Sequence, residues 1–213
     1  MRLFKRAPVV WCGLGLATIA SDLVFSMIPG VGEALGKVIS PVIECGLLIG
    51  AAALDHDQPL RLRHIVSAFN ARPSALAAIV SSSLLVFAAE AVTAYVLGGV
   101  NLLDPGLNED SLPTSVQVAR FVAGGVATLP VAFVPFAVLF EGASFPSAYA
   151  RSWRGFLLNV GPLLLFASLA AVLIFLGLLS FGVGLVAVFP LLSTASYAAW
   201  KDIYAASPRV ALV

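Results

Sequence analysis

Six ionisable residues interrupt long apolar stretches of this sequence: Asp22, Glu33, Lys37, Glu44, Glu90 and Arg120. A charged group in the middle of a membrane-spanning helix costs about 2.5–3.5 kcal/mol on insertion scales, so each residue is a candidate for function. Such groups carry protons or cations through transporters, and they also pair with one another to join helices. In the structural interpretation, three acids and two bases neutralise one another and join the helices; in the functional one, a polar cavity open to the periplasm carries protons or cations inward to Glu44.

Glu44 is the residue on which a transport function would depend. It follows Pro41 near the middle of its apolar stretch, whereas the other five fall in the outer half of the membrane. Glu33 and Lys37 have the favourable i, i+4 order for a helical ion pair, but Lys37 is seven residues from Glu44. The segment 45–54 offers no polar step beyond Glu44, which favours a structural role over conduction.

Two further groups combine apolar residues with bases at helical spacing. The first runs through Leu62, Ile65, Val66 and Phe69, with Arg61, Arg63 and His64 beside them. The second places Phe145, Tyr149 and Trp153 four residues apart, with Arg151 and Arg154 beside them. Both patterns predict short amphipathic helices at the membrane surface, where arginines reach the phosphates of anionic lipid headgroups. The alternative is a docking surface for a cytoplasmic partner.

Signals for catalysis or metal binding are weak. The cluster of Asp55, His56 and Asp57, with His64 further on, contains metal-ligating residue types but no zinc spacing. The two cysteines, Cys12 and Cys45, lie in apolar runs and form no CxxC pair. The sequence has no HExxH, GxSxG or phosphate-loop motif. We therefore expect no catalytic residue, no metal and no cofactor, and a protein that is not an enzyme.

The composition requires a membrane. Of 213 residues, 60% are hydrophobic and 11% are charged, whereas soluble proteins have roughly 45–50% and 25%. The net charge of +1 argues against a nucleic-acid partner, because phosphate backbones demand a basic excess. The apolar runs are long and unbroken, which indicates helices and not a β-barrel.

We predict an all-α membrane protein, a single domain over 1–213 with six transmembrane helices in three helical hairpins. Each span needs about 20 apolar residues, and the candidates are 8–28, 31–54, 74–98, 117–140, 155–179 and 182–201. The last two must be separated by a turn at 180–184. The first resembles a secretory signal, but its apolar run continues to Ile28, which favours a retained span.

The distribution of bases predicts that both termini are cytoplasmic. All lysines and arginines except Lys37 and Arg120 fall in the N-terminal segment, the second and fourth connections and the C-terminal end. The third connection carries Asp104, Glu109 and Asp110 and no base. The second, fourth and sixth spans also contain interior prolines, which kink a helix and free a carbonyl for another partner.

Four segments carry a family resemblance: 133–141, beginning Phe-Val-Pro-Phe and ending in Glu141; 148–154, with Tyr149, Arg151 and Trp153; 158–162; and 197–204, with Trp200 and Lys201. The chain resembles a family of uncharacterised proteobacterial six-span integral membrane proteins. The start of the chain (4–11) and the turn at 28–30 share the likeness. The resemblance implies a bacterial inner (cytoplasmic) membrane, and its motifs carry no known catalytic role.

The sequence favours a non-enzymatic accessory, scaffold or assembly factor, because its soluble loops are short and it lacks a catalytic constellation. Its expected partners are the lipid bilayer and a membrane protein or a second copy of itself. The alternative is a small transporter or channel for protons, cations or a proton-coupled solute, which would use Glu44 with Glu90 and Asp22.

Overall fold

The computed structural model describes residues 2–28, 32–104, 107 and 112–205, and over these residues it is helical and without strands. The helices are α1 (Arg2–Arg6), α2 (Pro8–Ser26), α3 (Gly32–Asp55), η1 (Leu62–Asn70), α4 (Pro73–Gly98), α5 (Thr114–Thr128), η3 (Leu129–Val131), α6 (Val134–Phe140), α7 (Phe145–Leu158), α8 (Val160–Leu179) and α9 (Leu185–Ala205). The all-α class is therefore confirmed.

Five helical segments in the described part of the chain are long and apolar enough to cross a membrane. They are Pro8–Ser26, Leu35–Asp55, Pro73–Gly98, Thr114–Phe140 and Val160–Leu179. The sixth expected span corresponds to α9, which is a helix but is not among the five. The prediction that the fifth span begins at 155 was wrong, because residues 155–158 continue α7 and the chain turns at Asn159.

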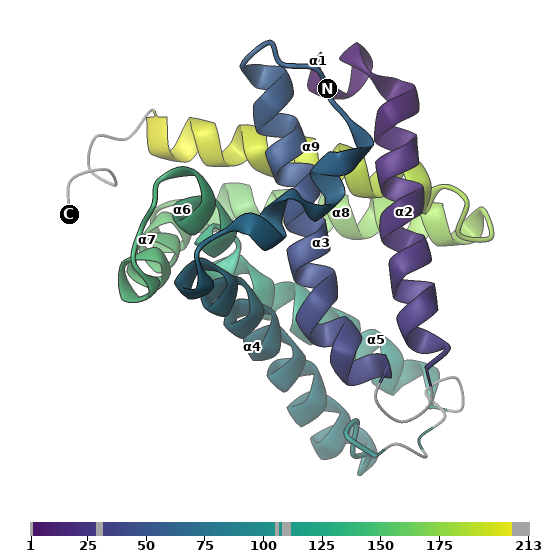
Figure 1. Ribbon diagram of the computed structural model, residues 1–213. Helices are drawn as coiled ribbons and strands as arrows, with labels where there is room; N and C mark the ends of the chain where they lie inside the picture. The colour runs from purple at the N-terminus through teal and green to yellow at the C-terminus, as the bar shows by residue number, and fades with distance from the viewer. Residues whose placement is uncertain (1, 29–31, 105–106, 108–111, 206–213) are drawn as a thin grey trace.

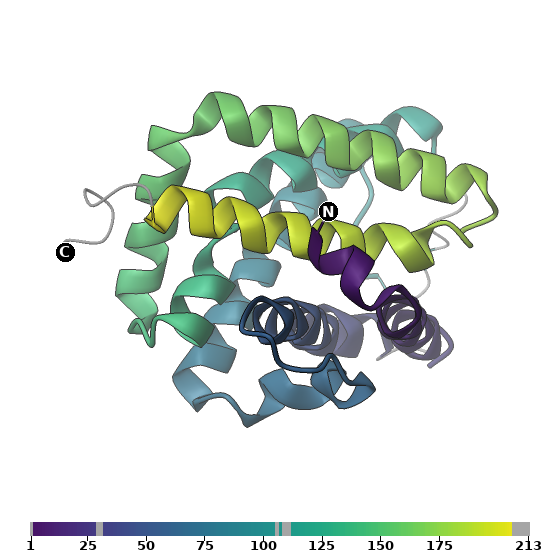
Figure 2. The ribbon, with the colours of Figure 1, turned by 90° about the horizontal axis from the view of Figure 1, so that it is seen from above.

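Helices that follow one another in the chain pack as hairpins: α2 with α3, α4 with α5, and α8 with α9. Figure 2 views α2 and α3 almost along their axes, whereas α8 and α9 lie lengthwise across the picture. The α8–α9 hairpin therefore crosses the α2–α3 hairpin steeply (Figure 1), and the three hairpins do not form a parallel bundle. The main core lies at this crossing and includes Trp11, Leu14 and Leu47 with Phe136 and Tyr197.

The fourth predicted span is interrupted at its prolines. Helix α5 ends at Thr128, a single 3₁₀ turn follows, and α6 begins at Val134. Ser152 of α7 is fully buried at this break, where its hydroxyl donates to the Pro130 carbonyl at 2.8 Å and accepts from the Phe133 N–H at 3.1 Å. One side chain thus satisfies two backbone groups that the interrupted helix leaves without an intrahelical partner.

Replacing Ser152 by alanine is expected to lower the free energy of unfolding by about 2–4 kcal/mol, because it leaves a buried donor and a buried acceptor without partners. Unfolding of the purified protein in mixed detergent micelles measures this loss. Ser168→Ala is the matched control, since the exposed Ser168 hydroxyl bonds only to a carbonyl of its own helix. Equal stability of the two variants would contradict this role of Ser152.

The two predicted surface helices take different forms. The segment around Leu62–Asn70 is helical but forms a 3₁₀ helix, η1, and it crosses α3 (Figure 1). The prediction of a 3.6-residue period was wrong here, because the tighter turn places Ile65 and Ala68 toward the protein and leaves Val66 and Phe69 exposed. The second, α7, is an α-helix with an exposed Trp153.

Candidate functional site

A cavity of about 370 Å³ opens where α3, α7, α9 and the end of α6 meet. We call it the polar–aromatic cavity, and it is lined by Asp55, His56, Glu141, Arg151, Tyr197, Trp200, Lys201 and Tyr204. The lining includes two carboxylates, two permanent cations and three aromatic residues with polar tips.

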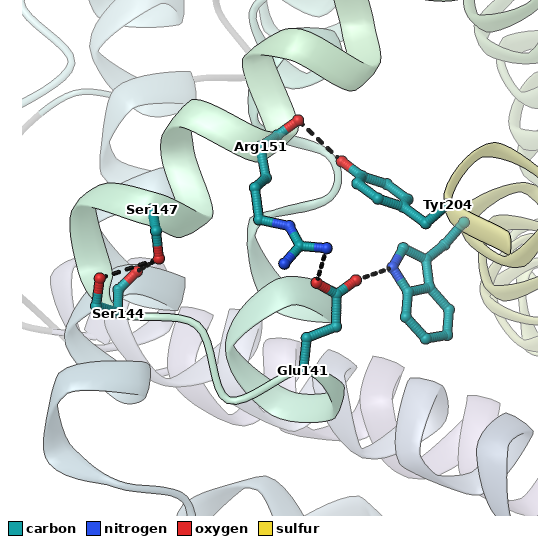
Figure 3. Close-up of polar contacts among 6 residues, drawn as sticks. Glu141, Ser144, Ser147, Arg151 and Tyr204 are labelled. Atoms are coloured by element: carbon teal, nitrogen blue, oxygen red, sulfur yellow. Dashed lines mark hydrogen bonds and ion pairs between the residues drawn. The ribbon is translucent and has the colours of Figure 1, made fainter. Parts of the chain in front are cut away.

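Glu141 reaches the cavity because the chain turns sharply after α6. Gly142, directly after it, has φ +65°, a left-handed conformation that glycine adopts without strain and that ends the helix. Ser144 precedes α7 as its N-cap residue, and its carbonyl accepts from the Ser147 hydroxyl at 3.0 Å (Figure 3). The turn brings the first residue after α6 opposite Arg151, two turns into α7.

Glu141 and Arg151 form the inner wall of the cavity. An Arg151 Nη atom lies 2.5 Å from Glu141 Oε2, and both side chains are largely buried. The indole N–H of Trp200 donates to Glu141 Oε1 at 3.0 Å, and the Tyr204 hydroxyl donates to the Arg151 carbonyl at 3.0 Å (Figure 3). The network therefore fastens the end of α9 to the α6–α7 turn.

A second ion pair forms the mouth of the cavity. Lys201 Nζ lies 2.6 Å from Asp55 Oδ2, and the Tyr197 hydroxyl donates to the same oxygen at 3.1 Å. Nearby, Arg6 pairs with Asp57 at 2.6 Å and donates to the Leu54 carbonyl. These contacts join the C-terminal ends of α1, α3 and α9, so segments predicted to share one side of the membrane lie together.

Trp200 is the centre of an aromatic cluster behind the cavity. Its ring lies 5.4–6.5 Å from those of Phe136, Phe140, Tyr197 and Tyr204, measured between centroids, and its arrangement with Phe136 is stacked. Such pairs add about 0.5–1.5 kcal/mol each beyond the area they bury. The cluster gives the polar wall a rigid support.

The charged side chains of the cavity are paired with one another. Each carboxylate already faces a base, and each also accepts a hydrogen bond from an aromatic side chain. Burial and the charge of Glu141 raise the pKa of Tyr204, so its hydroxyl remains a donor at physiological pH. Among the described residues no three His, Cys, Asp or Glu side chains gather as a metal ion would need.

The predicted intramembrane residues lie between successive helices. Asp22 of α2 accepts from the Ser40 hydroxyl of α3, and the Lys37 ammonium of α3 lies 4.8 Å from the centre of the Phe87 ring of α4. Glu90 of α4 lies against Gly124 of α5. Arg120, also on α5, is half-buried. The side chain of Glu33 lies outside the described residues.

Glu44 differs from these residues. Its side chain is exposed on α3, one turn beyond Ser40, and it interacts electrostatically with Asp22. Helix α3 therefore carries a carboxylate in its middle that the described helices do not cover.

The predicted interface residues divide into two sets. Arg61, Arg63, Trp153 and Arg154 are exposed, whereas Arg151 is committed to the ion pair with Glu141. His64 is half-buried, and its Nδ1 accepts from the Arg61 backbone N–H at 3.1 Å. Burial, with the charge of Arg63 as a further cause, lowers the pKa of His64, so this imidazole is neutral near pH 7.

Sequence reasoning did not assign the polar–aromatic cavity. It placed Arg151 in a predicted surface helix and quoted 133–141 and 197–204 only for a family resemblance, whereas the structure brings Glu141, Arg151 and Trp200 together. The sequence signal that could have indicated the cavity is a charged residue directly after an aromatic one, as Glu141 follows Phe140 and Lys201 follows Trp200. Both pairs fall on the same predicted side of the membrane. Comparison with protein-family models, with curated proteins and with solved structures found no match for this chain.

Proposed function

We propose that the chain is a six-span protein of the bacterial inner membrane, with both termini cytoplasmic, that acts as a non-enzymatic accessory, scaffold or assembly factor for a membrane-protein partner. The observation that carries this proposal is the division of α7 into two faces. One face holds Ser152 and Arg151 within the fold, and the other leaves Trp153 and Arg154 exposed. An exposed tryptophan beside an arginine has the composition of an interaction hot spot.

The contacts that the intramembrane charged residues make between helices support the same proposal. Asp22, Lys37 and Glu90 each contact the neighbouring helix, so they link α2 to α3, α3 to α4 and α4 to α5 in turn. A conduction path would instead need polar groups in sequence from one side of the membrane to the other. Contacts between adjacent helices are what a scaffold requires to keep its shape.

The proposal predicts a stoichiometric partner in native membranes. We expect a partner protein to co-purify in mild detergent and to be quantified by mass spectrometry. Reversing the charge at Arg154, with Arg154→Glu, is expected to lower its recovery about tenfold, because a charge lost from an interface costs roughly 1.4 kcal/mol or more. Arg72→Glu is the matched control, since Arg72 is equally exposed but precedes α4.

A transporter or channel is the second candidate, and the exposed carboxylate of Glu44 is the observation that favours it. Recovery of the protein alone, or only with copies of itself, would contradict a hetero-partner scaffold. Flux into proteoliposomes then decides the alternative. Glu44→Gln abolishes flux if this carboxylate carries the ion, whereas the same variant leaves partner recovery intact if the protein is a scaffold.

A further inference from the structure

The polar–aromatic cavity presents equal numbers of positive and negative side chains. Asp55 pairs with Lys201 at its mouth, and Glu141 pairs with Arg151 at its inner wall. A ligand with a single charge would displace one partner and leave the other buried without compensation, which is costly. A ligand that carries both signs can bridge the two pairs and keep every charge neutralised.

The positive side chains suit a phosphate. Arg151 lines the cavity, and its guanidinium carries five N–H donors, of which one Nη atom faces Glu141. Guanidinium donors match the oxygens of phosphate groups in geometry as well as in charge. Lys201 is about half exposed at the mouth, where its ammonium is available to an incoming anion.

The aromatic side chains suit an ammonium group. Two rings of the wall already lie near cations: Lys201 Nζ is 5.9 Å from the centre of the Tyr197 ring, and the Arg151 guanidinium carbon is 5.7 Å from that of Tyr204. Rings at this distance attract a cation through their negative faces. With Asp55 and Glu141 beside them, they form the kind of site that holds a ligand ammonium.

The position of the cavity indicates where such a ligand comes from. Asp55 ends the apolar segment Leu35–Asp55, so the mouth lies at the boundary of a predicted span. Tryptophan and tyrosine concentrate at this depth, among lipid headgroups. A volume of about 370 Å³ is within the usual range for small-ligand sites and accommodates a headgroup without its acyl chains.

We propose that the polar–aromatic cavity binds a zwitterion that carries a phosphate and a primary ammonium, the chemistry of a phosphoethanolamine headgroup. The phosphate faces Arg151 and Lys201, and the ammonium faces Asp55, Glu141 and the rings of Tyr197 and Tyr204. This inference concerns ligand binding and does not depend on the accessory function proposed above.

The test titrates the purified full-length protein in detergent with three probes: short-chain phosphatidylethanolamine, short-chain phosphatidylglycerol and soluble phosphoethanolamine. Binding is followed by tryptophan fluorescence, because Trp200 lies in the wall. We expect phosphatidylethanolamine to bind about tenfold or more tightly than phosphatidylglycerol, which lacks the ammonium group. Equal affinities for these two lipids, or binding of none of the three probes, would overturn the proposal.

The soluble probe distinguishes the source of the headgroup. Binding of phosphatidylethanolamine alone assigns the site to membrane lipid, and comparable binding of phosphoethanolamine assigns it to a free metabolite of the same chemistry; either result supports the site. Lys201→Gln is expected to weaken binding about tenfold, because it removes a charged contact. Lys5→Gln is the matched control, since Lys5 is also exposed and basic but does not line the cavity. Equal affinities of these two variants would contradict the assignment.

Discussion

Replacing Gly15 by alanine is expected to lower the free energy of unfolding by about 3 kcal/mol or more, because the new methyl group would enter backbone atoms of another helix. Gly15 is buried on α2, and a Cβ there would overlap the Val186 carbonyl oxygen of α9 and lie 3.0 Å from the Pro190 ring. A backbone oxygen cannot rotate away as a flexible side chain can. The α8–α9 hairpin would have to move off α2 to make room.

The sequence explains why this oxygen is available. Pro190 lies four residues after Val186 and has no N–H, so the Val186 carbonyl lacks its usual partner within α9. A glycine on the neighbouring helix allows that carbonyl to approach closely, as small residues do between membrane helices. Interior prolines were expected to free backbone carbonyls. Here the carbonyl freed by Pro190, that of Val186, lies against Gly15 of α2.

Thermal or denaturant unfolding in detergent measures the effect of Gly15→Ala. Gly125→Ala is the control, because Gly125 lies inside α5 and a Cβ there meets no atom within 4 Å. The control should be neutral or slightly stabilising, since alanine is a better helix former than glycine. If the two variants unfold alike, α9 does not pack on α2 as described.

The helices were the predictable part of the structure. Each depends on residues adjacent in the chain, so uninterrupted apolar segments such as α4 and α8 are recognised directly from composition. The turn predicted at 180–184 is confirmed, because α8 ends at Leu179 and α9 begins at Leu185. The turn includes Phe181 and Gly182 at positive φ.

The polar–aromatic cavity depends on how hairpins cross, and local patterns do not contain that information. Asp55 and Lys201 are 146 positions apart, and their pairing follows from the steep placement of α9 against α3. Arg151 illustrates the consequence. By spacing it belongs with Arg154 on an amphipathic surface helix, but the α6–α7 turn places Glu141 opposite it and commits it to the fold.

The amphipathic pattern at 62–69 failed for a different physical reason. Its apolar residues fit a 3.6-residue period, yet η1 has the tighter 3₁₀ winding, and its backbone lies directly on α3. The contact is made possible by Gly46, which has no side chain to hold η1 away. A single small residue on α3 therefore permits the close contact between this part of η1 and α3.

Gly46→Ala is expected to be as damaging as Gly15→Ala, because it closes the space in which η1 crosses α3. A Cβ at this position would overlap the His64 carbonyl oxygen and lie 2.6 Å from the Ile65 Cα. Both are backbone atoms, so η1 as a whole must move away, at a cost of about 3 kcal/mol or more. The start of α4 follows η1 directly and would move with it.

Cys45 reports this movement in the same molecule. Its thiol is buried next to Gly46, in a cluster that includes Ala68 of η1. In a Cys12→Ser background, we expect Gly46→Ala to speed labelling of Cys45 by N-ethylmaleimide in detergent, together with the loss of stability. Gly36→Ala is the control on the same helix, because a Cβ there makes only an ordinary contact, 3.5 Å from the Phe25 Cβ. Unchanged labelling and stability in Gly46→Ala would show that η1 does not cross α3 at this glycine.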